Sequence, residues 1–165
     1  MKINYLKMPG LCGPGILLLL LMAGCTRTTP PTPFVNSMSA QVGSHIFTAT
    51  QVDGIYSRTL GLMGVIGTGM TGKDSTKLLL EFPYIPRRSH PFSSDTTKTS
   101  VSYFSGREIF TAFVHNGRIL VSLSAADTVK HTFAGAFSGI LYNPYNLKDS
   151  EVVNGKFNSA YTVYP

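Results

Sequence analysis

Short runs in which apolar and polar residues alternate constrain the fold of this chain more than any other feature. The segment "RILVSLSA", residues 118–125, places Ile119, Val121 and Leu123 on one face, with Leu120 and two serines on the other. About nine such runs occur along the chain at short spacing, and no segment carries the apolar stripe of an amphipathic helix. We therefore expect an all-β fold, an antiparallel β-sandwich or partly closed barrel of about eight or nine strands.

The same pattern gives the positions of the strands. The candidates are residues 39–42, 45–50, 59–66, 77–82, 101–105 and 156–164. Two further runs flank Asn116-Gly117, a pair that favours a type I′ turn, so we expect a hairpin there. Residues 129–143 also alternate, although four of their apolar residues sit at helical spacing. Gly135 and Gly139 inside this run favour a strand whose backbone closely approaches a neighbour.

The N-terminal residues 1–24 have the layout of a secretory signal peptide. Lys2 and Lys7 provide positive charge, an apolar run spans residues 16–22, and Ala23-Gly24 are small. The alternative is an uncleaved membrane helix, which needs about 20 apolar residues. Proline and glycine residues between positions 9 and 15 interrupt the apolar run. We therefore expect a cleaved signal peptide.

Cys25 follows the small residues, and the segment "LMAGC" resembles the bacterial lipobox. The resemblance implies transfer of a diacylglyceryl group to the Cys25 thiol, cleavage before this residue, and acylation of the new amino terminus. Two or more acyl chains anchor a protein stably, since each buried methylene contributes about 0.8 kcal/mol. The other cysteine, Cys12, lies inside the signal peptide, so a processed chain would carry no disulfide.

The expected processed chain divides into a tether and one domain. Residues 25–37 are rich in threonine and proline and have no periodicity, which is typical of an extended tether. Residues 38–165 are expected to form a single β domain large enough for its own core. The scattered basic residues suggest ordinary solvation or, alternatively, an affinity for an anionic headgroup. Because an exported protein does not meet nucleic acid in the cytoplasm, we do not expect a nucleic-acid partner.

A glycine-rich stretch, "GLMGVIGTGMTGKDS" at residues 61–75, matches the spacing of nucleotide-binding loops. Gly67, Gly69 and Gly72 reproduce the dinucleotide pattern, and Lys73 adds a partial phosphate-loop match. No helix is expected after Gly72, and Asp74 occupies the position where a phosphate loop needs a hydroxyl. We therefore expect a flexible hairpin connection between residues 66 and 77, and no nucleotide.

The residues that could support catalysis or bind a metal are dispersed. The histidines are His45, His90, His115 and His131. The acidic residues are Asp53, Asp74, Glu81, Asp95, Glu108, Asp127, Asp149 and Glu151. No spacing brings them into a ligand set or a carboxylate pair, and no nucleophile elbow of the form G-x-S-x-G occurs. We therefore expect no enzyme activity, no cofactor and no metal, and we expect Asp127 and Asp149 to occupy turns.

Tyrosines near the C-terminus are the best candidates for a binding surface. Tyr142, Tyr145, Tyr161 and Tyr164 lie near one another in the sequence, with Asn143 and Asn146 beside the first two. Such residues could form a sugar-stacking platform or the rim of a pocket. The alternative is that they simply flank strands, as tyrosines often do.

The C-terminal third resembles small lipoproteins of the Bacteroidota that are built on a domain of unknown function. The matching pieces are Asp127, the segment 131–135 and the segment 153–157 that runs on to Tyr164. The start, "MSAQVGSHIFTAT", is also similar. This chain has Phe47 where the family usually has Trp, and His131 where it usually has Gly. The resemblance implies a β-rich lipoprotein fold with Asn154-Gly155 in a turn and Phe157 in the core, and it implies no activity.

These observations together predict a lipid-anchored lipoprotein of the cell envelope. Its β domain would be non-enzymatic, with a binding or structural role, and its partners would be the membrane through acylated Cys25 and an unidentified envelope protein, lipid or glycan. The alternative is a small-ligand or glycan binder that uses a barrel mouth or a tyrosine-rich edge. The lack of acidic residues just after Cys25 favours the periplasmic face of the outer membrane over the cell surface.

Overall fold

The strands of the described residues all lie between Ser37 and Tyr164. The computed structural model describes residues 33–84, 92–93, 99–106, 108–112, 119–146 and 150–165. A compact unit spans Phe34–Pro165 and contains every strand and every buried hydrophobic residue of the described part. It begins a few residues before the predicted start at Met38, because Asn36 is tied into it. The Asn36 amide donates to the Val52 carbonyl over 3.0 Å and accepts from the Ala160 N–H over 2.9 Å.

The described residues form ten strands and no helix. The strands are β1 (Ser37–Val42), β2 (His45–Ser57), β3 (Leu62–Thr71), β4 (Asp74–Pro83), β5 (Phe92–Ser93), β6 (Ser100–Ser105), β7 (Glu108–Thr111), β8 (Ile119–Asp127), β9 (Thr132–Tyr142) and β10 (Ser150–Tyr164). The expected all-β class is therefore confirmed, and residues 132–142 form a strand rather than a helix.

The strands are joined in one sheet whose hydrogen bonding closes on itself. Its order is β1-β10-β2-β3-β4-β6-β7-β9-β8-β5, with further pairings of β1 with β2 and of β10 with β9. The path from β10 through β2, β3, β4, β6, β7 and β9 thus returns to β10. This ring is consistent with the predicted sandwich or partly closed barrel. Neighbouring strands pair antiparallel except for β10 and β2, which run parallel along Tyr161–Tyr164 and Gly54–Ser57.

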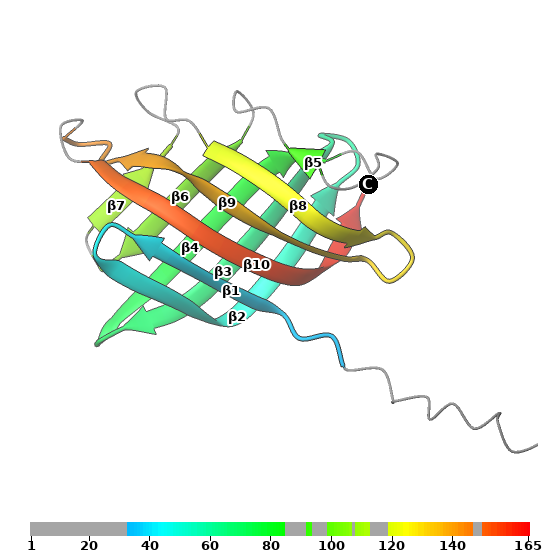
Figure 1. Ribbon diagram of the computed structural model, residues 1–165, viewed down its shortest axis with the longest axis horizontal. Helices are drawn as coiled ribbons and strands as arrows, with labels where there is room; N and C mark the ends of the chain where they lie inside the picture. Colours follow the sequence, from blue (N-terminus) through cyan, green and yellow to red (C-terminus); the bar gives the residue numbers. More distant parts are fainter. Residues whose placement is uncertain (1–32, 85–91, 94–98, 107, 113–118, 147–149) are drawn as a thin grey trace, which may run out of the picture. The chain divides into compact units, whose positions relative to one another are not determined.

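Two layers of strands enclose the core. Strands β1, β10, β9 and β8 form one layer, and they cross in front of the strands β3, β4 and β6 (Figure 1). Large side chains fill the space between the layers. Phe82 on the second layer lies 6.2 Å from Phe133 and 6.0 Å from Phe157 between ring centroids. Phe47 is fully buried and contacts Tyr103 edge-on.

Phenylalanine and glycine alternate across the β9–β10 pair. Phe137 lies opposite Gly155, and Phe157 lies opposite Gly135. Each ring occupies the space where the opposite residue would carry its Cβ atom, so neither glycine can be replaced without moving a ring. The close backbone approach that we expected at Gly135 is confirmed, since an added Cβ would also lie 2.5 Å from the Ser122 carbonyl oxygen.

Two predictions about turns were wrong. Asn154-Gly155 lies inside β10, because Gly155 is needed beneath the Phe137 ring rather than in a turn. Strands β7 and β8 do not form a hairpin, since β9 lies between them in the sheet. The Asn116-Gly117 pair itself falls outside the described residues.

Tight turns at other positions use a positive φ. Gly72 has a φ of 64° in the two-residue turn between β3 and β4, which agrees with the expected hairpin. His131 has a φ of 52° at the end of the turn between β8 and β9, and it is the one residue other than glycine with a positive φ in the described part of the chain. Glycine adopts this conformation without a steric penalty, whereas a residue with a Cβ atom does not.

Candidate functional site

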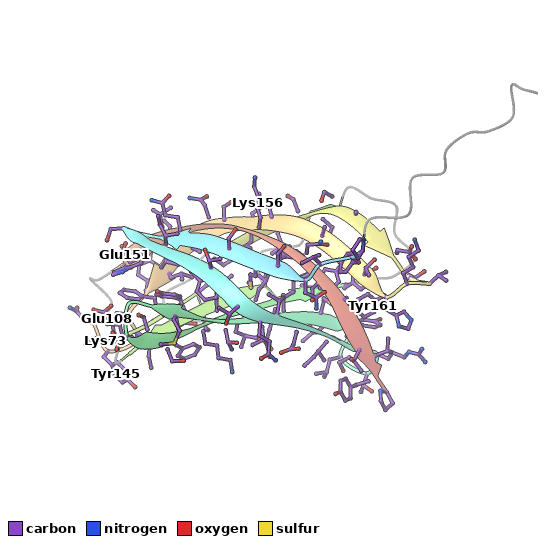
Figure 2. All side chains as sticks on the ribbon, turned by 90° about the horizontal axis from the view of Figure 1, so that it is seen from below. Lys73, Glu108, Tyr145, Glu151, Lys156 and Tyr161 are labelled. Atoms are coloured by element: carbon purple, nitrogen blue, oxygen red, sulfur yellow. The ribbon has the colours of Figure 1, made fainter. Side chains whose placement is uncertain are left out.

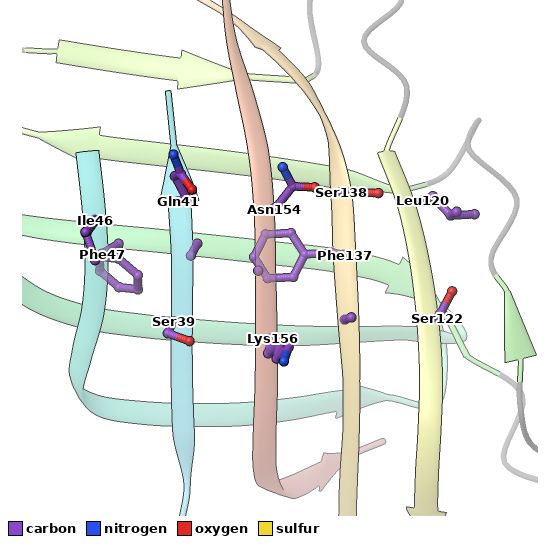
Figure 3. A pocket seen from close by; sticks show the side chains of 13 residues that line it. Ser39, Gln41, Ile46, Phe47, Leu120, Ser122, Phe137, Ser138, Asn154 and Lys156 are labelled. Atoms are coloured by element: carbon purple, nitrogen blue, oxygen red, sulfur yellow. The ribbon is translucent and has the colours of Figure 1, made fainter. Parts of the chain in front are cut away.

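A groove lies on the outward face of β1, β10, β9 and β8. Its volume is about 590 Å³. The first residues of β2 complete it at one side, and Figure 3 shows the outward side chains that surround it. Three residues whose side chains are buried on the other face, Ala40, Phe47 and Phe137, also line it. The strand backbone therefore forms the floor of the groove.

The register of the strands arranges the lining residues in two parallel rows. We call the first the lysine row: Ser39, Lys156, Ala136 and Ser122 lie opposite one another on β1, β10, β9 and β8. We call the second the amide row: Ile46, Gln41, Asn154, Ser138 and Leu120 lie opposite one another on β2, β1, β10, β9 and β8. The same two rows are visible one above the other in Figure 3.

The lysine row is hollow because its other members are small. Ser39 and Ala136 flank Lys156, whose long side chain projects from the outside of the layer (Figure 2). Lys156 is the only charged residue in either row. Among the described residues its ammonium group has no hydrogen-bond or ion-pair partner. The outward acids are several residues away by register: Asp53 on β2 precedes Gly54, the partner of Tyr161, and Asp127 pairs with Thr132, four residues along β9 from Ala136.

The neutral polar groups of the rows are also available for binding. Ser39, Ser122, Ser138 and Asn154 have no side-chain hydrogen bond within the described part of the chain. Gln41 differs, since its Nε2 donates to the Gly43 carbonyl over 3.0 Å. The groove thus offers hydroxyl and amide groups around one cation.

Exposed aliphatic side chains border the amide row. This apolar rim consists of Ile46, Leu120, Ile140 and Val152, which are 76%, 45%, 43% and 56% exposed. Val152 and Ile140 lie directly opposite each other on β10 and β9, one step beyond the amide row. Ile46 and Leu120 form the two ends of that row. Ile46 and Leu120 line the groove, and Ile140 and Val152 extend the apolar surface just beyond it, on the side away from Lys156.

The segment before β1 bounds the side of the groove where Lys156 lies. The Asn158 amide, one step beyond Lys156 on β10, donates to the Val35 carbonyl over 2.9 Å. Phe34 covers a smaller cavity of about 130 Å³ over Ala134 and the end of β8. The chain thus enters the domain beside the groove.

The tyrosines do not gather into the platform that was considered as one of two interpretations of their positions in the sequence. Tyr142 lies at the end of β9 opposite Ser150, whereas Tyr161 lies next to Ala160, which pairs with Thr132 at the start of β9. The two tyrosine pairs therefore lie at opposite ends of the β9–β10 pair, as the labels of Tyr145 and Tyr161 in Figure 2 show. Sequence proximity was misleading because the strand between them spans the length of the sheet.

The neighbours of these tyrosines have structural roles. The Asn143 side-chain oxygen accepts from the Tyr145 N–H over 2.9 Å and from the Asn146 N–H over 3.3 Å, which shapes the turn after β9. Tyr161 is buried in an aromatic cluster with Tyr56 and Tyr84. Burial, with Tyr161 and Tyr56 nearby, raises the pKa of Tyr84 to about 12. Burial also raises the pKa of Tyr161.

The histidines and acids do not gather. The described residues include no group of three His, Cys, Asp or Glu side chains that could hold a metal ion. His131 stacks on Tyr161 with ring centroids 5.2 Å apart. Asp127 was expected in a turn but is the last residue of β8, and its carboxylate caps the turn that follows by accepting from the Lys130 and Val129 N–H groups over 2.9 Å each. The Lys130 N–H contributes most to lowering the Asp127 pKa. His90, His115, Asp95 and Asp149 lie outside the described residues.

The glycine stretch is a strand rather than a phosphate loop. Gly67 and Gly69 lie inside β3, where an added Cβ at Gly69 would be 2.5 Å from the Thr48 carbonyl oxygen. At Gly67 an added Cβ would meet the Met38 sulfur at 2.8 Å. The expected connection was therefore too long, because only Gly72 and Lys73 form the turn. These glycines make room for the neighbouring strand and for core side chains.

Comparison of the chain with protein-family models, with curated proteins and with solved structures gives no match. Within the described residues, no helix is long and apolar enough to cross a membrane. Cys25 and the segment to residue 32 lie outside the described residues.

Proposed function

We propose that this protein is a lipid-anchored lipoprotein of the cell envelope whose β domain binds a ligand and has no enzyme activity. The observation that supports binding most is the groove, in which Lys156 has no partner among the described residues. Its volume falls within the range of about 300–1,000 Å³ that is usual for ligand sites. A purely structural role gives no reason for this hollow, uncharged surface around a single cation.

The absence of enzyme activity is part of the proposal. In the described part of the chain no hydrogen bond joins a serine to a histidine, which a serine nucleophile with a histidine base would need. The test is a panel of ester and glycoside substrates incubated with residues 34–165. We expect no turnover above the rate without protein, and turnover that a serine-directed inhibitor abolishes would contradict this part.

The lipid anchor rests on the pattern around Cys25 and on the similarity of residues 127–164 to Bacteroidota lipoproteins. The test is expression of the full chain in a bacterium that processes lipoproteins, with an alkyne-tagged palmitate in the medium. We expect the chain to be labelled, the Cys25→Ala variant to lose the label, and the Cys12→Ala variant to keep it. Labelling of Cys25→Ala, or no labelling of the unaltered chain, would contradict the anchor.

The proposed location is the periplasmic face of the outer membrane. The reason is the segment Thr26–Thr29, which carries no acidic residue after Cys25. Protease added to intact cells distinguishes the two faces. The domain should be spared in intact cells and cut after the outer membrane is permeabilised, whereas cutting in intact cells would place it on the cell surface.

A second candidate function is glycan binding at a barrel mouth or a tyrosine-rich edge. Tyr145 and Tyr164 favour it, since they are 84% and 52% exposed. Their placement at opposite ends of the β9–β10 pair leaves each to act alone. A set of neutral and acidic oligosaccharides tested by thermal shift would support this candidate only if stabilisation were lost in Tyr145→Ala or Tyr164→Ala.

A further inference from the structure

We infer that the groove binds an amphiphilic anion, with its carboxylate or phosphate group beside Lys156 and its aliphatic part on the apolar rim. The inference rests on the proposal that this is a binding domain, and it adds the chemical class of the ligand. Three features of the groove carry it: the charge of the lysine row, the position of the rim and the lack of an exposed aromatic ring.

The charge of the lysine row selects an anion. Lys156 has no carboxylate within either row and no partner in the described part of the chain. An anionic group placed here gains a charge-assisted hydrogen bond without displacing an existing ion pair. Ser39, directly opposite Lys156 on the neighbouring strand, adds a hydroxyl donor for another of its oxygen atoms. A cationic ligand would be repelled.

The rim selects an aliphatic part at a defined distance from the charge. Val152 lies four residues from Lys156 along β10, which corresponds to about 13 Å. Ile140 stands opposite Val152, and Ile46 and Leu120 form the sides. Covering these exposed side chains is favourable, at about 25 cal/mol per Å² of apolar surface. The ligand must therefore be charged at one end and apolar at the other.

Other occupants fit the groove less well. Sugars stack on exposed aromatic faces, but the two aromatic residues that line this groove, Phe47 and Phe137, are buried. A second copy of the chain related by a two-fold axis through the groove would bring two Lys156 side chains together without a counter-charge. A single-chain lipid anion avoids both problems.

The experiment is calorimetric titration of residues 34–165, the unit that holds the whole described core, with amphiphiles below their micelle concentrations. The probes are dodecanoate, dodecyl phosphate, the neutral dodecyl maltoside, and acetate. We expect at least one of the two dodecyl anions to bind about tenfold more tightly than the maltoside, and acetate to show no binding. The tighter of the two anions identifies the head group.

Two variants connect this binding to the groove. Lys156→Gln removes the charge and should weaken binding of the preferred anion about tenfold. Ala136→Leu fills the hollow beside Lys156 and should weaken it as much. Lys77→Gln is the matched control, because Lys77 is an exposed lysine on β4 in the other layer, and it should leave the affinity unchanged. Circular dichroism and thermal melting confirm that each variant is folded.

The inference is overturned if neither dodecyl anion binds, if the maltoside binds as tightly, or if Lys156→Gln binds like the unaltered domain. These outcomes are separable from failure of the anchor. A chain labelled at Cys25 whose domain binds no amphiphile would retain the anchor and lose this inference. A domain that binds dodecanoate through Lys156 would retain the inference even if Cys25 were never acylated.

Discussion

The two faces of the β9–β10 pair use the same alternation for different purposes. On the inward face, large rings stand opposite glycines: Phe137 over Gly155 and Phe157 over Gly135. On the outward face, the residues between them are small or polar, and Lys156 stands opposite Ala136. Small residues make room in both cases. Inside, a neighbouring ring fills that room, whereas outside it stays open as the groove.

The largest effect should come from removing an inward ring. Phe157→Ala leaves a cavity among Phe82, Phe133 and Phe137, which all contact the Phe157 ring. We expect a loss of about 3–5 kcal/mol in the free energy of unfolding, measured by urea denaturation. The outward variant Lys156→Gln should change it by less than about 0.5 kcal/mol. Equal effects of the two would contradict the contrast between the faces.

A smaller effect should follow from adding one methyl group beneath a ring. Gly155→Ala places its Cβ in the space of the Phe137 ring, so the ring must move, and we expect a loss of about 1–3 kcal/mol. Gly64→Ala on β3 is the control, since its nearest contact would be 4.0 Å away. We expect the control to change the free energy of unfolding by less than about 1 kcal/mol. A larger loss in the control would refute the explanation.

Substitutions at His131, in the turn that precedes β9, should change the free energy of unfolding by about 1 kcal/mol. His131 has a φ of 52°, which glycine adopts more readily than alanine, and its ring stacks on Tyr161. Both His131→Gly and His131→Ala lose the stacking, but only alanine keeps the backbone penalty. We therefore expect the glycine variant to be more stable by about 1 kcal/mol in thermal or urea unfolding. A more stable alanine variant would show that the turn carries no such penalty.

The smallest effect should come from the protonation of the buried Tyr84. This protonation changes the stability of the fold only at high pH and has no effect near neutrality. Burial raises the pKa of Tyr84 from 10.0 to about 12, so the folded state keeps a proton that the unfolded chain loses first. This contribution is fully present below pH 10 and is lost as the pH rises toward 12. Tyr84→Phe should therefore flatten the fall in melting temperature over this window. An identical fall in both proteins would contradict the assignment.

Much of the fold could be predicted from the sequence because the inward face leaves a periodic signal. Ile119, Val121 and Leu123 alternate as expected and are fully buried. The pairing of strands was harder, since a strong local turn signal such as Asn154-Gly155 also suits a strand glycine under a ring. The parallel pairing of β10 with β2 joins residues about a hundred positions apart and has no local signal.

The groove could not be predicted, because no segment contains it. Ser39, Lys156, Ala136 and Ser122 come from four strands and meet only through the sheet register. Each alone looks like an ordinary exposed strand residue. A partial signal exists in the paired segments "GAF" at 135–137 and "GKF" at 155–157, whose middle residues are Ala136 and Lys156. Tyrosine clustering was a misleading signal, since β10 separates Tyr145 from Tyr161 and spans the length of the sheet.

The most direct test of the groove as the binding site is a titration of the isotopically labelled domain, residues 34–165, with dodecanoate, followed by NMR of its backbone amides. Binding at the groove predicts that the amides of Gln41, Asn154, Lys156 and Ser138 shift together, and that those around Tyr161 and Tyr164 do not. Shifts confined to the tyrosine ends of the strands, or no shifts at all, would contradict the assignment of the outward face of β1, β10, β9 and β8 as the functional surface.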